Sequence, residues 1–129
     1  MTAVNDGITE LASVFDFEET LSRVIAAIGS AGLTIFARID HAENARVAGL
    51  TMPPTTLLIY GNARGGTPIM LAAPRAALDL PLRVLVRQVD TGAVIAFHAM
   101  APALRTAGVP DDMAHKLDPA QRIFVEAAQ

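Results

Sequence analysis

The sequence predicts an α+β domain of two layers, in which a curved antiparallel sheet of about five strands packs against N- and C-terminal helices. Amphipathic helical patterns lie near both ends of the chain, and short apolar runs rich in β-branched residues lie between them. Two of these runs are joined by Asp90-Thr91-Gly92, which is typical of a hairpin turn. The length of 129 residues suits a single domain spanning residues 1–129.

The first long helix is predicted over residues 17–31. Asp16 stands at the expected N-cap, and Glu19 three residues later gives the spacing of a capping box. Gly32 is expected to end the helix in the left-handed conformation. Apolar side chains recur at helical spacing and form one stripe for burial, namely Phe17, Leu21, Val24, Ile25 and Ile28.

Strands are predicted on both sides of this helix, over residues 8–15 and 33–39. Asp40 and Glu43 repeat the capping-box spacing, so a short helix is expected over residues 41–48, with Gly49 closing it. The Pro53-Pro54 pair is expected to interrupt regular secondary structure, and a third strand is expected over residues 55–60.

The second half of the chain begins with Thr67-Pro68, a pair typical of an N-cap and a first helical residue. We therefore expect a helix from Thr67-Pro68 to about Ala73. Asp118 is expected to cap the last helix. The remaining predicted elements are a turn over residues 74–77, strands over 82–89 and 93–99, and helical segments over 102–107, 110–116 and 119–127.

The chain is apolar, with 52% hydrophobic and 18% charged residues and a mean hydropathy of +0.40. A membrane span needs about 20 consecutive apolar residues, and the apolar runs here are far shorter, so no span is expected. The surplus apolar surface predicts burial in a ligand cavity or in the interface of a homodimer.

Charge and cysteine content exclude several other functions. The net charge is −3 and no basic stripe is present, so we expect no nucleic-acid partner. The chain has no cysteine, which removes disulfides, thiol nucleophiles and cysteine-based zinc sites. The first residues lack a basic segment followed by an apolar one, so we expect no secretory signal and a cytoplasmic location.

Four segments together resemble the bacterial and archaeal family called Domain of Unknown Function 302. They are ARIDHA at residues 37–42, LLIYGN at 57–62, GTPIM at 66–70 and ALDLPLRVLV at 77–86. The resemblance extends from about Ile8 to the last helix. It implies a compact α+β domain with a curved antiparallel sheet, an architecture like that of the TATA-binding protein, and often a dimer. It implies no biochemical function. The chain departs from the family pattern at Tyr60, where Phe is common, and at Ala63, where proline is common.

The segment from Tyr60 to Thr67 is the predicted ligand-binding site. A glycine pair allows positive φ angles, so that successive N–H groups face one anion, and a following helix N-terminus adds donors. An arginine beside the pair suits a carboxylate or phosphate. The residues expected to contact a small anionic or amphipathic ligand are Tyr60, Asn62, Arg64, Gly65, Gly66 and Thr67. The alternative is a plain strand-to-helix connection in which the same residues only satisfy turn geometry.

A second alternative is a small enzyme with Asp79 or His41 as general base. Asp79 lies between leucines, where a buried carboxylate needs a partner, and Arg64 or the glycine-loop N–H groups are candidates. His41 follows Asp40, whose capping role explains the pair without catalysis. His98 is expected in the core or an interface. The histidine spacing predicts no metal site, and no cofactor can be assigned. A third alternative is an interaction or scaffold module without a ligand.

Overall fold

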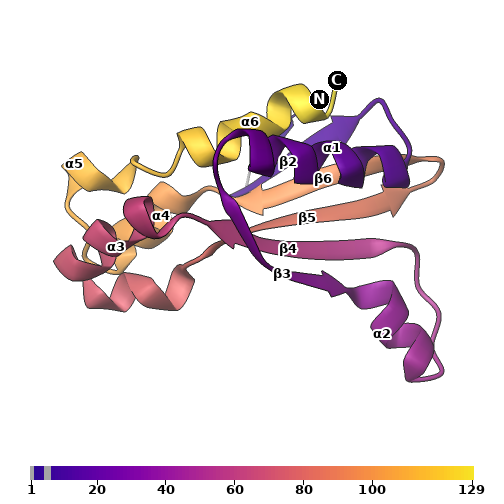
Figure 1. The fold of residues 1–129 in the computed structure, drawn as a ribbon, viewed down its shortest axis with the longest axis horizontal. Helices are drawn as coiled ribbons and strands as arrows, with labels where there is room; N and C mark the ends of the chain where they lie inside the picture. Colours follow the sequence, from indigo (N-terminus) through magenta and orange to yellow (C-terminus); the bar gives the residue numbers. More distant parts are fainter. Residues whose placement is uncertain (1, 5–6) are drawn as a thin grey trace.

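The computed structural model describes residues 2–4 and 7–129, which form one antiparallel sheet and surrounding helices (Figure 1). The sheet has six strands in the order β1-β2-β6-β5-β4-β3. The elements are β1 (Thr2–Val4), β2 (Ile8–Ser13), α1 (Phe17–Ser30), β3 (Thr34–Asp40), α2 (His41–Val47), β4 (Thr55–Gly61), α3 (Ala63–Ala72), η1 (Pro74–Asp79), β5 (Leu82–Val89), β6 (Gly92–His98), α4 (Met100–Thr106), α5 (Asp111–Ala114) and α6 (Pro119–Ala127). The predicted α+β class and antiparallel sheet are confirmed. Strand β1 lies in a stretch where no strand was predicted.

Helices α1 and α6 lie side by side over one face of the sheet (Figure 1). Strand periodicity explains this layer, because alternate residues of each central strand point into it. In β5, for example, Val84 and Val86 are fully buried, while the alternate residues Arg83 and Leu85 are more exposed. The opposite face is therefore the less covered one.

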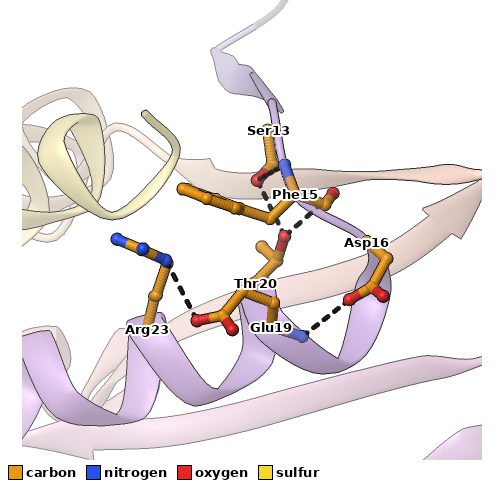
Figure 2. A network of polar contacts seen from close by, with 6 residues as sticks. All are labelled: Ser13, Phe15, Asp16, Glu19, Thr20 and Arg23. Carbon is orange, nitrogen blue, oxygen red and sulfur yellow. Dashed lines mark hydrogen bonds and ion pairs between the residues drawn. The ribbon is translucent and has the colours of Figure 1, made fainter.

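The start of α1 matches the prediction closely. The Asp16 side chain accepts a hydrogen bond from the N–H of Glu19 at 2.9 Å, which makes Asp16 the N-cap (Figure 2). The Glu19 carboxylate turns instead to Arg23, with Nε 3.1 Å away, so only half of the capping box forms. Arg23 also lies over the ring of Phe15, 3.7 Å from its centroid. Gly32 ends the helix with φ +74°, as predicted.

A partly buried pair of hydroxyl groups joins β2 to α1. Ser13 Oγ lies 2.7 Å from Thr20 Oγ1, and Ser13 Oγ also accepts the N–H of Phe15 at 3.2 Å (Figure 2). Thr20 is fully buried among apolar residues of the helix stripe, so its hydroxyl needs these partners. The contact links the end of β2 to the first turns of α1.

The prediction that α3 starts at Thr67-Pro68 is wrong. The helix starts at Ala63, and Asn62 is its N-cap, with its side-chain oxygen accepting the N–H of Arg64 at 2.8 Å. Asn is as good a cap as Ser or Asp and comes directly after β4, so the helix forms one turn earlier. Pro68 consequently lies inside α3.

Asp118 does not cap α6, contrary to the prediction. Its backbone is already helical, with φ −55° and ψ −44°, a geometry unlike the extended backbone of an N-cap. Its carboxylate lies 2.8 Å from Nδ1 of His115, whose Nε2 lies 2.7 Å from Nη2 of Arg105. A guanidinium can only donate, so Nε2 accepts and Nδ1–H donates to Asp118. The Asp118 side chain, through His115 and Arg105, thus connects the start of α6 to α5 and α4.

Candidate functional site

A cavity of about 600 Å³ lies where α3 meets the C-terminal helices. Its walls come from the end of α1, the edge strand β3, the end of β4, α3, the segment between η1 and β5, and the α5–α6 junction. The volume is within the range of small-molecule sites. Its large apolar side chains are Leu33, Phe36, Met70, Leu80, Leu82, Leu117 and Ile123.

The cavity brings together four of the six predicted site residues. Asn62, Gly65, Gly66 and Thr67 line it. Arg64, which shares their helix turn, is exposed and does not line it. The helical geometry explains why Arg64 differs from its neighbours, because residues on one side of α3 face the cavity while Arg64 points away.

The prediction that the N–H groups of the glycine pair face an anion is wrong. Gly65 and Gly66 belong to α3 and do not have positive φ. Their N–H groups are already used, since both donate to the carbonyl oxygen of Asn62, at 3.1 and 2.9 Å. The Asn62 side chain takes the N–H of Arg64. The first turn of α3 therefore has these amides paired and offers them to no ligand.

The glycines instead leave room in the cavity wall. A Cβ on Gly65 would lie 3.8 Å from Leu117 Cδ2, and a Cβ on Gly66 would lie 3.8 Å from Met70 Cε. Both are ordinary contact distances between atoms that face the cavity, so a side chain there would occupy space that is now open. Gly61 similarly brings the end of β4 close to the cavity, beside Phe36.

Tyr60 lies in the core next to the cavity and is not among its lining residues. Its side chain is fully buried, and its hydroxyl donates to the carbonyl oxygen of Ala120 at 2.9 Å. Its ring packs edge-on against Phe124, with centroids 5.6 Å apart. Burial raises the pKa of Tyr60 well above its usual range, because the phenolate would lose its hydration. The hydroxyl that distinguishes this residue from phenylalanine is used in the core.

Sequence reasoning missed the wall contributed by the C-terminal helices. Lys116, Leu117, Ala120 and Ile123 line the cavity although they lie more than 45 residues from the loop. Among the described residues that line the cavity, Lys116 is the only charged one, and it is the only lysine of the sequence. No local pattern marks these residues, because only the packing of α6 against α1 and the sheet brings them here.

The two predicted catalytic residues do not share a site. His41 is the exposed first residue of α2 and lines none of the cavities described here. Asp40 accepts the N–H of Glu43 at 2.9 Å and caps α2, as predicted. Asp79 is half-buried and lines a second cavity that neither Arg64 nor the glycine pair lines, and it makes no hydrogen bond or ion pair with them. The side chain of His98 is exposed and not in the core.

Two further properties concern only the described residues. No helix of residues 7–129 is both long and apolar enough to cross a membrane. Within the described chain, no three His, Asp or Glu side chains come together in a way that would hold a metal ion.

Comparison with solved structures gives a strong match in fold. The crystal structure of uncharacterized conserved protein DUF302 from Bacillus stearothermophilus superposes with a TM-score of 0.82, covering 96% of this chain and 97% of that one. The sequences are only 12% identical, so the likeness concerns the fold alone.

Comparison with curated proteins gives matches to parts of longer chains. Fluoride-specific ion channel FluC 1 of Brucella suis biovar 1 (strain 1330) is 38% identical over 91 residues, which is 70% of this chain and 36% of that protein. FluC 1 of Brucella abortus biovar 1 (strain 9-941) is also 38% identical over 91 residues, with 34% of its length covered. The chain thus spans about a third of these relatives. The family profile described as Domain of unknown function DUF302 matches residues 9–128, and the chain belongs to this family.

Proposed function

We propose that this chain is a ligand-binding domain whose site is the cavity beside Asn62–Thr67, and that the ligand is a small amphipathic molecule with one anionic group. The observation that carries the proposal is the composition of the cavity. Seven large apolar side chains and a glycine-rich helix turn line a space of about 600 Å³, with Lys116 as the one charged group among the described lining residues.

The apolar walls supply most of the expected affinity. Each CH₂ group that leaves water contributes about 0.8 kcal/mol. A single exposed charge contact contributes about 1 kcal/mol or less because water screens it. An apolar body of several carbons therefore outweighs the charged group, which sets the orientation of the ligand.

Lys116 gives the site its preference for a negative group. Its side chain is exposed, and it makes no ion pair or hydrogen bond with another described residue. The side chains of Asn62 and Thr67 add hydrogen-bonding groups to the lining. A ligand can place a carboxylate or phosphate near Lys116 and its apolar part among Leu33, Leu80 and Leu117. Such a ligand contacts both the charged group and the apolar walls of the cavity.

The proposal can be tested by titrating ¹⁵N-labelled protein with decanoate, using decyltrimethylammonium as the oppositely charged control. Decanoate should shift the amide resonances of residues 61–70 and 116–123 and should bind more tightly than the cation. Gly66→Leu should weaken decanoate binding by about tenfold or more, because the added side chain fills the cavity. Lys116→Gln should remove the preference for decanoate over the cation.

Arg64→Gln is the matched control, since Arg64 is in the same helix turn but outside the cavity. It should leave decanoate binding unchanged. Equal binding of decanoate by wild type and Gly66→Leu would contradict the proposal, as would shifts confined to other parts of the chain.

The Brucella relatives favour a second candidate, an accessory domain of a fluoride channel. The matched part is about a third of proteins named as fluoride-specific ion channels. A channel must cross the membrane, and no described helix of this chain is able to. We infer that the shared part lies outside the pore and senses a ligand there. Fluoride efflux from cells lacking this chain should then be altered, and wild type but not Gly66→Leu should restore it. Unchanged efflux would refute this second function and leave the first intact.

We further infer that the domain is cytoplasmic and forms a homodimer. Several large apolar side chains are strongly exposed in the single chain, among them Leu78 of η1 at 86% and Leu71 of α3 at 78%. A second copy is the simplest partner for such surface. Sedimentation at micromolar concentration should give twice the 13.6 kDa chain mass, and a single-chain mass would contradict the dimer. Of the two residues expected as alternative general bases, Asp79 lines the second cavity and His41 is the exposed first residue of α2.

A further inference from the structure

A second cavity of about 600 Å³ shares one backbone segment with the first. Leu80, Pro81 and Leu82 line the first cavity, whereas Asp79 and Arg83, on either side of them, line the second. The second cavity also takes residues from β2, β4, β6 and α4. It differs from the first in chemistry, since its lining includes a carboxylate, a guanidinium and an imidazole.

Arg83 is placed in this cavity by the register of β5. Arg83, Leu85 and Arg87 alternate along the strand and so share the less covered face of the sheet. Arg87 has a structural partner on that face, the Glu10 carboxylate at 3.2 Å. Arg83 has no hydrogen bond or ion pair with any other described side chain. One arginine of the face is thus paired within the protein, and the other is available to a ligand.

Asp79 is available in the same way. It is the last residue of η1 and is half-buried, and its carboxylate makes no hydrogen bond or ion pair with another described residue. It lines the same cavity as Arg83, yet the two opposite charges are not paired with each other. A half-buried carboxylate gains most from a positively charged partner.

His98 and an apolar floor complete the lining. Leu85 pairs with Ala96, and Arg83 and His98, each two residues away along its strand, lie on the same face and also line the cavity. Leu57, Leu85 and Ala96 lie in one row across three adjacent strands and supply apolar surface to the cavity.

We propose that this second cavity binds a zwitterionic molecule, with a carboxylate and an ammonium group on a small apolar body, as in a free amino acid. The guanidinium of Arg83 presents a fork of N–H donors that matches a carboxylate. The Asp79 carboxylate accepts hydrogen bonds from the ammonium group. The apolar body lies on Leu57, Leu85 and Ala96. One such ligand pairs both free charges at once, which a purely anionic or purely cationic molecule does not do.

The test uses L-leucine and two analogues that each lack one of its charges, 4-methylpentanoate and 3-methylbutylamine. Leucine should shift the amide resonances of residues 79–85 and 96–100 in the full chain. It should bind about tenfold more tightly than either analogue. Should none of the twenty standard amino acids shift these amides at millimolar concentration, the proposal is overturned. It is also overturned if leucine binds no better than both analogues.

Two charge-removing variants assign the roles. Arg83→Gln should reduce the affinity for leucine about tenfold and leave the affinity for 3-methylbutylamine unchanged. Asp79→Asn should also reduce the affinity for leucine about tenfold, and it should leave the affinity for 4-methylpentanoate unchanged. Arg87→Gln, on the same strand and face, should leave all three affinities unchanged. Gly66→Leu should also bind leucine like wild type, which separates this site from the first cavity. Variants that weaken all three molecules equally would refute the assignment of charges.

Discussion

The hydroxyl of Tyr60 donates a hydrogen bond to the main-chain carbonyl oxygen of Ala120 at a distance of 2.9 Å. The bond joins β4 to α6 through the core, where the Tyr60 ring also packs against Phe124. Ala120 lines the first cavity, and Gly61 beside Tyr60 does so as well. The contact therefore holds together two walls of the proposed ligand site.

Replacing Tyr60 by Phe should lower the free energy of unfolding by about 0.5–1.5 kcal/mol, the usual loss for one intramolecular hydrogen bond. The ring and its contact with Phe124 remain, so the fold should be kept. Urea denaturation of both proteins measures the difference. Equal midpoints would show that the hydroxyl contributes no stability.

The same residue predicts a loss of stability at high pH. Burial raises the pKa of Tyr60 in the folded protein, whereas the unfolded chain has the ordinary value of about 10. Above that pH the unfolded state loses this proton while the folded state keeps it, so the free energy of unfolding falls as pH rises. Wild type should show a fall between pH 10 and 11 that Tyr60→Phe lacks. Parallel curves for the two proteins would contradict this.

Asp16→Ala should lower the free energy of unfolding by about 0.5–2 kcal/mol, because the N–H of Glu19 loses its acceptor. Asp16→Asn keeps a side-chain oxygen at the same position and serves as the control. It should retain most of the stability in chemical denaturation. If both variants behaved like wild type, α1 would not depend on this cap.

Gly66→Ala should raise the free energy of unfolding by about 0.5–1 kcal/mol. Gly66 has a helical backbone inside α3, and alanine is the better helix former there. The new Cβ would meet Met70 and Leu80 only at 3.8 and 4.0 Å, so no clash opposes this gain. Thermal unfolding measures the effect, and a fall in stability would refute the helical assignment.

Local signals in the sequence predicted the elements that depend on local chemistry. The caps at Asp16 and Asp40 form because a short acidic side chain reaches an N–H three residues later. Gly32 and Gly49 end their helices at positive φ, where other residues are strained. The span of β5 was predicted to the residue, since turns and prolines bound it on both sides.

The features that sequence reasoning missed depend on packing or on competition between signals. The Thr67-Pro68 pair predicted the start of α3, but Asn62 directly after β4 caps the helix one turn earlier. Asp118 has the residue type of a cap, but His115 competes for its carboxylate. The wall that Lys116 contributes to the first cavity requires α6 to dock on the sheet, and no spacing within the C-terminal segment reveals that contact.

The most direct test of the proposed ligand site is the measurement of intermolecular nuclear Overhauser effects between decanoate and the methyl groups of the protein. The proposal predicts effects from the decanoate chain to Leu33, Leu80, Leu117 and Ile123, with none to Leu57 in the second cavity. Their loss in Gly66→Leu should accompany the loss of binding. Effects to Leu57 alone, or no effects with saturating decanoate, would contradict the assignment of the first cavity as the binding site.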